Sequence, residues 1–187
     1  MGTTSDLRPG AYIRFNGELA QVLESQHRTP GNLRAFYQVK MRVVRTGKLM
    51  ENRFRSGESI DFVRVEKKPY QYLYREGNML YFMDQETYDQ IPISEDMVGD
   101  AIKFLKENQE VQIAFEENNV LGVDLPPNVV LRIAHTEPGV KGDTATNVLK
   151  PATTETGAII NVPLFVNEGD LVRVDTTTGE YLDRVKE

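Results

Sequence analysis

The residues best suited to chemistry lie in one polar segment, residues 26–34, which reads Gln-His-Arg-Thr-Pro-Gly-Asn-Leu-Arg. Arg28 and Arg34 flank a Pro30-Gly31 pair, and guanidinium groups are good donors to phosphate. Pro fixes φ and Gly supplies positive φ, so we expect a tight turn here. The residues predicted to form the functional part of this loop are Arg28, Thr29, Pro30, Gly31, Asn32, Leu33 and Arg34. An ordinary hairpin loop with solubilising arginines is the simpler alternative.

A second group of candidates lies in the last third of the chain. Tyr181 and Arg184 are three residues apart, and an aromatic ring together with a cation can stack on and clamp RNA. The small polar residues Gly142, Asp143 and Thr144 could meet a nucleic-acid backbone. A half-buried tyrosine, a solvated arginine and a plain turn explain the same residues equally well.

The sequence lacks the usual signatures of catalysis and metal binding. It has no Cys and two His, His27 and His135, which are far apart in the chain. It also lacks the Gly-rich phosphate-binding and dinucleotide motifs and the Gly-x-Ser-x-Gly motif of hydrolases. We therefore expect no catalytic residue, no metal and no cofactor. Acidic pairs such as Asp84/Glu86 and Glu116/Glu117 leave an acid–base enzyme as an alternative, which would require close carboxyls with raised pKa values.

Charge is unevenly distributed along the 187 residues, whose net charge is −6. Residues 1–65 hold eleven basic and six acidic side chains, whereas residues 66–128 hold five and thirteen and residues 129–187 hold six and nine. A basic first third favours a polyanionic partner, although solvated surface charge would look the same. No apolar run approaches the length of a membrane span and no signal-peptide core is present, so we expect a cytoplasmic protein without membrane contact.

Alternating apolar residues and turn signals predict an all-β chain. An Asn16-Gly17 turn, the strongest short hairpin signal, is followed by a predicted polar loop over residues 24–34. The strands predicted in the first third cover residues 11–15, 19–23, 37–43, 49–54 and 60–65, which suggests a small closed barrel.

Two Pro-containing boundaries divide the rest of the chain. Lys67-Lys68-Pro69 and Pro126-Pro127 predict three consecutive small β modules over residues 1–65, 66–128 and 129–187. One helix is predicted in the middle module, capped by Ser94 and continuing to Leu105. The other strands are predicted at residues 70–74, 79–83, 111–115, from 120, 129–134, 158–162, 164–166, 171–174 and 181–185, with a long loop over 137–156.

The whole chain resembles bacterial elongation factor P. The most specific part of the resemblance is a spaced set in the last module: Lys150, Ala152, Gly157, Ile160, Val162, Pro163, Val166 and Gly169. Supporting stretches cover residues 137–145, 178–185 and 45–48. The resemblance implies three β-barrel domains in an elongated L shape, the first SH3-like and related to factor 5A and the other two OB-like.

The resemblance also implies a function. Such proteins bind the 70S ribosome beside peptidyl-tRNA, contact ribosomal RNA, act as monomers and relieve stalls at consecutive prolines. The loop of the first domain would point into the peptidyl-transferase centre, and the last domain would lie near the small subunit. The alternatives are the family's elongation-factor-P-like paralogue, with a different physiological role, and an RNA-binding β module that acts outside the ribosome.

The loop tip departs from the commonest family pattern. Many members carry a Lys or Arg there that is extended by a covalent modification, whereas this chain has Asn32. An amide offers neither an amine nor a guanidinium to extend. We therefore expect the loop to work unmodified, with Pro30-Gly31 keeping it rigid; modification of Arg34 is the alternative.

Overall fold

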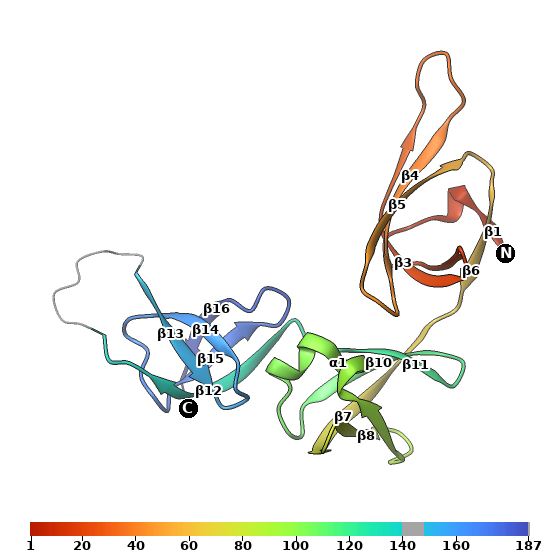
Figure 1. Ribbon diagram of the computed structural model, residues 1–187. Coiled ribbons are helices and arrows are strands. Elements are labelled where there is room, and N and C mark those ends of the chain that lie inside the picture. Colours follow the sequence, from red (N-terminus) through yellow and green to blue (C-terminus); the bar gives the residue numbers. More distant parts are fainter. Residues whose placement is uncertain (140–147, 187) are drawn as a thin grey trace. The chain divides into compact units, whose positions relative to one another are not determined.

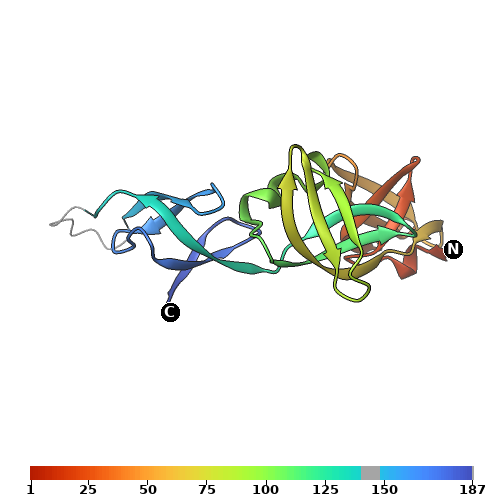
Figure 2. The same ribbon diagram turned by 90° about the horizontal axis from the view of Figure 1, so that it is seen from below.

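The computed structural model describes residues 1–139 and 148–186, and its architecture is three antiparallel sheets (Figures 1 and 2). The predicted all-β class is confirmed. The chain divides into two compact units, Met1–Lys67 with Ala114–Gly122 and Lys68–Ile113 with Val123–Glu187. No helix in the described part of the chain is long and apolar enough to cross a bilayer.

The first sheet has six strands in the order β1-β6-β2-β3-β4-β5. Their bounds are β1 Gly2–Thr3, β2 Tyr12–Phe15, β3 Glu18–Arg28, β4 Phe36–Val43, β5 Leu49–Arg55 and β6 Ser59–Val63, with a short 3₁₀ helix, η1, at Thr4–Asp6. The predicted Asn16-Gly17 turn joins β2 to β3, and both residues have positive φ, 51° and 78°. Buried Ile13, Val22 and Val39 belong to the core that the alternating pattern places on one face.

Strand β3 is longer than the sequence predicts. Residues 24–28 are strand rather than loop, and they pair with β4 out to Arg28 opposite Phe36. The expectation of a polar loop from residue 24 is therefore wrong. These five residues are all polar, and a strand with no apolar alternation gives no signal in the sequence. Strand β5 accompanies them to the same end, with Arg55 opposite Phe36, and the connection from β3 to β4 lies within the orange segment in Figure 1.

The middle sheet has five strands in the order β11-β10-β7-β8-β9. They are β7 Glu66–Glu76, β8 Met79–Asp84, β9 Gln90–Ser94, β10 Glu110–Glu116 and β11 Asn119–Asp124. Strand β9 was not predicted. Strand β7 runs through Pro69 without interruption. Buried Tyr72, Leu80 and Phe82 lie on the inner face of this sheet.

The predicted single helix is wrong in extent. The α-helix α1 covers only Glu95–Val98 and the 3₁₀ helix η2 covers Gly99–Phe104. Ser94 caps α1 as predicted, because its side chain accepts a hydrogen bond from the Met97 amide. Gly99 has φ of +64°, which ends the α-helical turn.

The third sheet has the order β14-β13-β12-β15-β16. Its strands are β12 Asn128–Thr136, β13 Leu149–Thr154, β14 Ile159–Pro163, β15 Leu171–Asp175 and β16 Tyr181–Val185. Strand β13 lies inside the predicted loop over residues 137–156, and residues 164–166 are not a strand, so both expectations are wrong. Strand β13 was not predicted because it contains Pro151, and a proline within a run of residues argues against a strand.

The third sheet is supported by η2 from the same compact unit. Phe104 packs against the third core, and the Thr156 hydroxyl donates to the Lys103 carbonyl at 2.5 Å. Glu155 adds an ion pair, with its Oε1 3.1 Å from Lys106 Nζ. Burial raises the pKa of the Glu155 carboxyl, but the Arg132 amide and the Lys106 ammonium outweigh it, so this pKa is lowered.

Candidate functional site

The candidate loop connects β3 to β4 through seven residues, 29–35. The Leu33 amide donates to the Pro30 carbonyl at 3.1 Å, which closes a four-residue turn. Pro30 is thus the first residue of the turn and not the second. Neither Gly31 nor Asn32 has positive φ, so the expectation that Gly31 supplies it is wrong.

The loop presents its side chains to solvent. Leu33 is 74% exposed, which rules out a packing role for it within this chain. Gly31, Asn32 and Arg34 are also exposed. Over residues 1–139 and 148–186, no hydrogen bond or ion pair engages the Arg34 side chain, so its guanidinium is available to a ligand.

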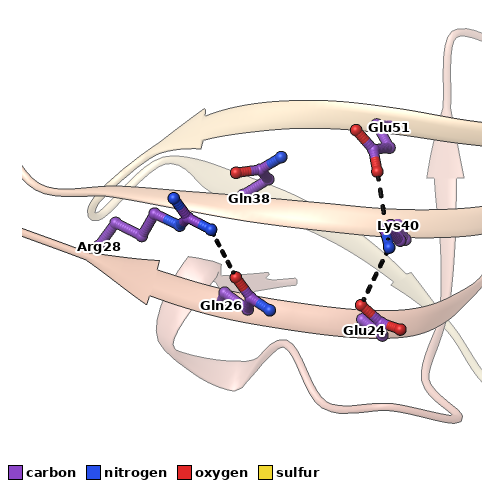
Figure 3. A pocket seen from close by; sticks show the side chains of 6 residues that line it. All are labelled: Glu24, Gln26, Arg28, Gln38, Lys40 and Glu51. Carbon is purple, nitrogen blue, oxygen red and sulfur yellow. Dashed lines mark hydrogen bonds and ion pairs between the residues drawn. The ribbon is translucent and has the colours of Figure 1, made fainter.

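Below the loop, one face of the hairpin carries a row of polar side chains (Figure 3). Lys40 lies between two carboxylates of neighbouring strands, 3.4 Å from Glu24 and 3.9 Å from Glu51. Nearer the loop, Arg28 Nη2 donates to Gln26 Oε1 at 3.0 Å. The shallow pocket of about 200 Å³ along this face is lined by Glu24, Gln26, Arg28, Gln38, Lys40 and Glu51.

Charge on this face changes along the hairpin. Around Lys40, the two carboxylates of Glu24 and Glu51 outnumber the single ammonium group. The end of the hairpin nearer the loop is basic. Strand pairing sets Arg53 opposite Gln38 and Arg55 opposite Phe36, so both arginines share the face of Arg28. The Arg53 guanidinium carbon lies 5.1 Å above the Phe36 ring.

Arg53 and Arg55 are functional candidates that sequence reasoning missed. Arg53 lies within the predicted strand over residues 49–54 and Arg55 directly follows it, and the alternation of β5 exposes both side chains. Their position beside the loop depends on the β4–β5 register, which sets Arg53 opposite Gln38 and Arg55 opposite Phe36.

His27 lies on the opposite face of the same hairpin. Its ring packs against Tyr37 in a tilted arrangement, with the centroids 4.6 Å apart and an interplanar angle of 31°. This contact gives His27 a structural role in the hairpin.

In the third sheet, the structure brings the candidates Tyr181 and Arg184 to one side of β16. In a regular strand, residues three apart point to opposite faces of the sheet. Here a bulge places Tyr181 opposite Val174 and Arg184 opposite Val172, so that both side chains lie on the same face. Tyr181 packs against the core, and burial raises its pKa while the Arg184 charge opposes the rise. Arg184 lies 5.2 Å above the Phe165 ring and 3.7 Å from Asp170. Gly142, Asp143 and Thr144 lie outside the described residues.

The carboxyl pairs do not have the geometry of an acid–base site. Asp84 accepts hydrogen bonds from the amides of Glu86 and Thr87, and these bonds lower its pKa. Glu116 is ion-paired with Arg14. Wherever the pKa of a carboxyl is shifted in residues 1–139 or 148–186, it is lowered. A general acid would need the opposite shift.

The fold defines the class of protein first. The solved structure of eukaryotic translation initiation factor 5A from Methanococcus jannaschii matches with a TM-score of 0.52 and 19% identity, covering 67% of this chain and 90% of that one. An eIF-5A family protein from Naegleria fowleri matches with a TM-score of 0.51 and 14% identity, covering 66% and 96%. This is therefore an all-β protein with the fold of factor 5A over two thirds of its length.

Sequence comparison then gives the family. Residues 3–60 match the model of the elongation factor P KOW-like domain, residues 65–123 that of its OB domain and residues 129–184 that of its C-terminal domain. Elongation factor P of Chloroflexus aurantiacus is 55% identical over 186 residues, 98% of either chain. That of Clostridium botulinum is 49% identical over 185 residues, 99% of this chain and 100% of its own. The chain belongs to the elongation factor P family of translation elongation factors, which confirms the resemblance.

Proposed function

We propose that this protein binds the 70S ribosome beside peptidyl-tRNA and promotes peptide-bond formation, thereby relieving stalls at consecutive prolines. The observation that carries the proposal is the basic end of the β3–β4 hairpin. There a seven-residue loop with a free Arg34 lies at the end of paired strands that also carry Arg28, Arg53 and Arg55 on one face.

The mechanism is positional. Proline is a conformationally restricted substrate, so the reacting groups are poorly aligned in the absence of the factor. A protein that holds the acceptor end of peptidyl-tRNA lowers the entropic cost of alignment and contributes no acid or base. Arg28 and Arg34 would meet phosphates of the tRNA or of ribosomal RNA, and the exposed Leu33 would supply an apolar contact.

The C-terminal sheet supplies a second contact in this proposal. Arg184 lies over the Phe165 ring and within 3.7 Å of Asp170, and the other face of its guanidinium could stack on a base or meet a phosphate. Gly142, Asp143 and Thr144 remain predicted contacts. We expect the protein to act as a monomer in the cytoplasm.

The loop tip is proposed to work without covalent modification. Asn32 is exposed and has no group that lysylation or glycosylation could extend. The Pro30–Leu33 hydrogen bond orders the turn by itself. The mass of the intact protein from its native host tests this point: any mass added to the loop would refute it.

The experiment that tests the function is translation of a reporter with a triple-proline stretch in a reconstituted bacterial system. Unmodified recombinant protein should relieve the stall. The matched control is the same reporter with the prolines replaced by alanine, on which the protein should have no effect.

Failure takes two distinguishable forms. Ribosome binding without relief would favour the paralogue or a missing modification. Absence of ribosome binding, with tight and strongly salt-dependent binding to free RNA, would favour an RNA-binding module that acts outside the ribosome.

A further inference from the structure

The outer face of the middle sheet carries an aromatic stripe that the proposed function does not use. Tyr74 on β7 and Tyr81 on β8 stack with ring centroids 4.7 Å apart and an interplanar angle of 14°. Strand pairing sets Pro92 of β9 opposite Tyr81, so the stripe runs across three neighbouring strands, which Figure 2 shows side by side. We call Tyr74, Tyr81 and Pro92 the tyrosine stripe.

The stripe is not part of the core. Leu80 and Phe82, on either side of Tyr81, are 0% exposed and point inward, so Tyr81 points outward. Tyr74 is 42% exposed and Pro92 is exposed. Met79 and Met83 share the face of Tyr81 and are half-buried, which extends the apolar surface along β8.

The chemistry of this surface favours a cation. The faces of aromatic rings carry a negative quadrupole, which attracts guanidinium and ammonium groups. Glu76 lies two residues from Tyr74 on β7, pairs with Met79, and makes none of the ion pairs found among residues 1–139 and 148–186. The stripe thus combines a π surface with a carboxylate at its border.

The charge of the surrounding module indicates which cation. Residues 66–128 carry thirteen acidic and five basic side chains, a surplus that repels nucleic acid and attracts a basic polypeptide. Arginine suits the stripe better than lysine because its planar guanidinium stacks on tyrosine rings while its N–H groups reach a carboxylate. Pro92 adds an apolar edge for the aliphatic stem.

We propose that the tyrosine stripe is a docking surface for an arginine-bearing segment of a basic protein. The arginine stacks on the Tyr74–Tyr81 pair, and its guanidinium edge meets Glu76. The tyrosine stripe lies on other strands than the β3–β4 hairpin, and the proposal does not depend on how that hairpin acts.

To test the proposal, the full chain is titrated with a short peptide in which arginine and serine alternate. The amide and tyrosine NMR signals of the protein are recorded during the titration, once at low salt and once at moderate salt. A lysine–serine peptide of equal length and an oligoadenylate RNA are the comparison ligands. We expect the arginine peptide to shift the signals of β7, β8 and β9, and to bind more tightly than the lysine peptide.

Variants separate stacking from charge. The Tyr74→Leu/Tyr81→Leu protein should bind about tenfold more weakly, whereas Tyr74→Phe/Tyr81→Phe should bind normally because both rings remain. Tyr88→Leu is the matched control, since Tyr88 is 71% exposed and lies outside the stripe; we expect its affinity to change less than about twofold. Glu76→Gln should weaken arginine binding and reduce its salt dependence.

Several results would overturn the proposal. The first is that the arginine peptide does not bind. The second is that the double leucine variant binds the peptide as tightly as the unsubstituted protein while its thermal unfolding is normal. The third is that the NMR shifts are confined to another surface. Preferential binding of the RNA at the stripe would assign the surface to nucleic acid instead. If the double leucine variant does not fold, the proposal is tested by Glu76→Gln, which should weaken arginine binding, and by the lysine peptide, which should bind more weakly than the arginine peptide.

Discussion

The β3–β4 hairpin end and the β15–β16 surface, the two regions proposed to contact RNA, differ in how their arginines are held. At the hairpin end, Arg34 has no partner among the described residues and Arg28 is held only by the neutral Gln26. On the β15–β16 surface, both arginines already face carboxylates: Arg173 is 2.8 Å from Asp183 and Arg184 is 3.7 Å from Asp170. Arg28 and Arg34 can bind an anion without breaking an ion pair, whereas the C-terminal surface must exchange one ion pair for another.

The two regions also differ in their support. Within its own sheet, the hairpin end is braced by the ion pairs of Lys40 and by ring contacts such as His27–Tyr37. The third sheet is held in addition by η2, through Phe104 and the Lys106–Glu155 ion pair. Under the proposed function, the arginines at the hairpin end would contact the reactant, and the more strongly supported C-terminal sheet would anchor the protein.

The largest effect is expected for Arg34→Ala. A charge-assisted hydrogen bond to phosphate is worth about 1.5–3 kcal/mol, so stall relief at saturating factor should fall about tenfold or more. Ribosome affinity should change less, because the loop is a small part of the contact. Rates of triple-proline synthesis over a range of factor concentrations measure both quantities. Arg42→Ala, on β4 away from the loop, is the control; an equal loss there would remove the special role of Arg34.

Arg184→Ala should act on binding instead. We expect ribosome affinity to fall about three- to tenfold while stall relief at saturating factor is unchanged, because an anchor does not touch the reacting groups. A pelleting or fluorescence binding assay, run beside the translation assay, separates the two. If the Arg184→Ala protein does not relieve the stall even at saturating concentration, Arg184 does more than anchor the protein, and the assignment of positioning to the hairpin and anchoring to the C-terminal sheet is wrong.

Asp170→Asn sharpens the same comparison with a smaller effect. The change removes the carboxylate that competes for Arg184 and keeps an oxygen that can accept the Asn167 amide. Surface ion pairs are worth little, so ribosome affinity should rise by about twofold at most. A marked fall in affinity, with unchanged thermal unfolding, would mean that Asp170 itself meets the ligand.

The smallest effect concerns acid stability. The folded-state pKa of Glu155 is lowered, so its carboxylate contributes stability above the ordinary carboxyl pKa of about 4, and this contribution is lost as pH falls through the folded value. Glu155→Gln should therefore lower the thermal midpoint by about 2 °C at neutral pH, and this difference should shrink as pH falls through the lowered pKa of Glu155. Glu180→Gln serves as an exposed control. A destabilisation by Glu155→Gln that persists at low pH would show that packing, and not charge, is responsible.

Prediction from sequence succeeded where local signals were strong. The Asn16-Gly17 turn and the cap at Ser94 are both present. It failed where tertiary pairing overrode local pattern, as in β13, which contains Pro151, and in the polar outer part of β3. The predicted module boundaries and loop contacts remain predictions.

By itself the sequence determined the family, the all-β class and the loop that carries Arg34, because these depend on residue identity and on local alternation. Only the tertiary structure decided which charges lie together. The β4–β5 register brings Arg53 and Arg55 to the face of Arg28, and a bulge brings Tyr181 and Arg184 to one side of β16. The physical reason is that register and bulges are set by how the strands pair and pack in the folded sheet, and a shift of one residue moves every side chain to the opposite face.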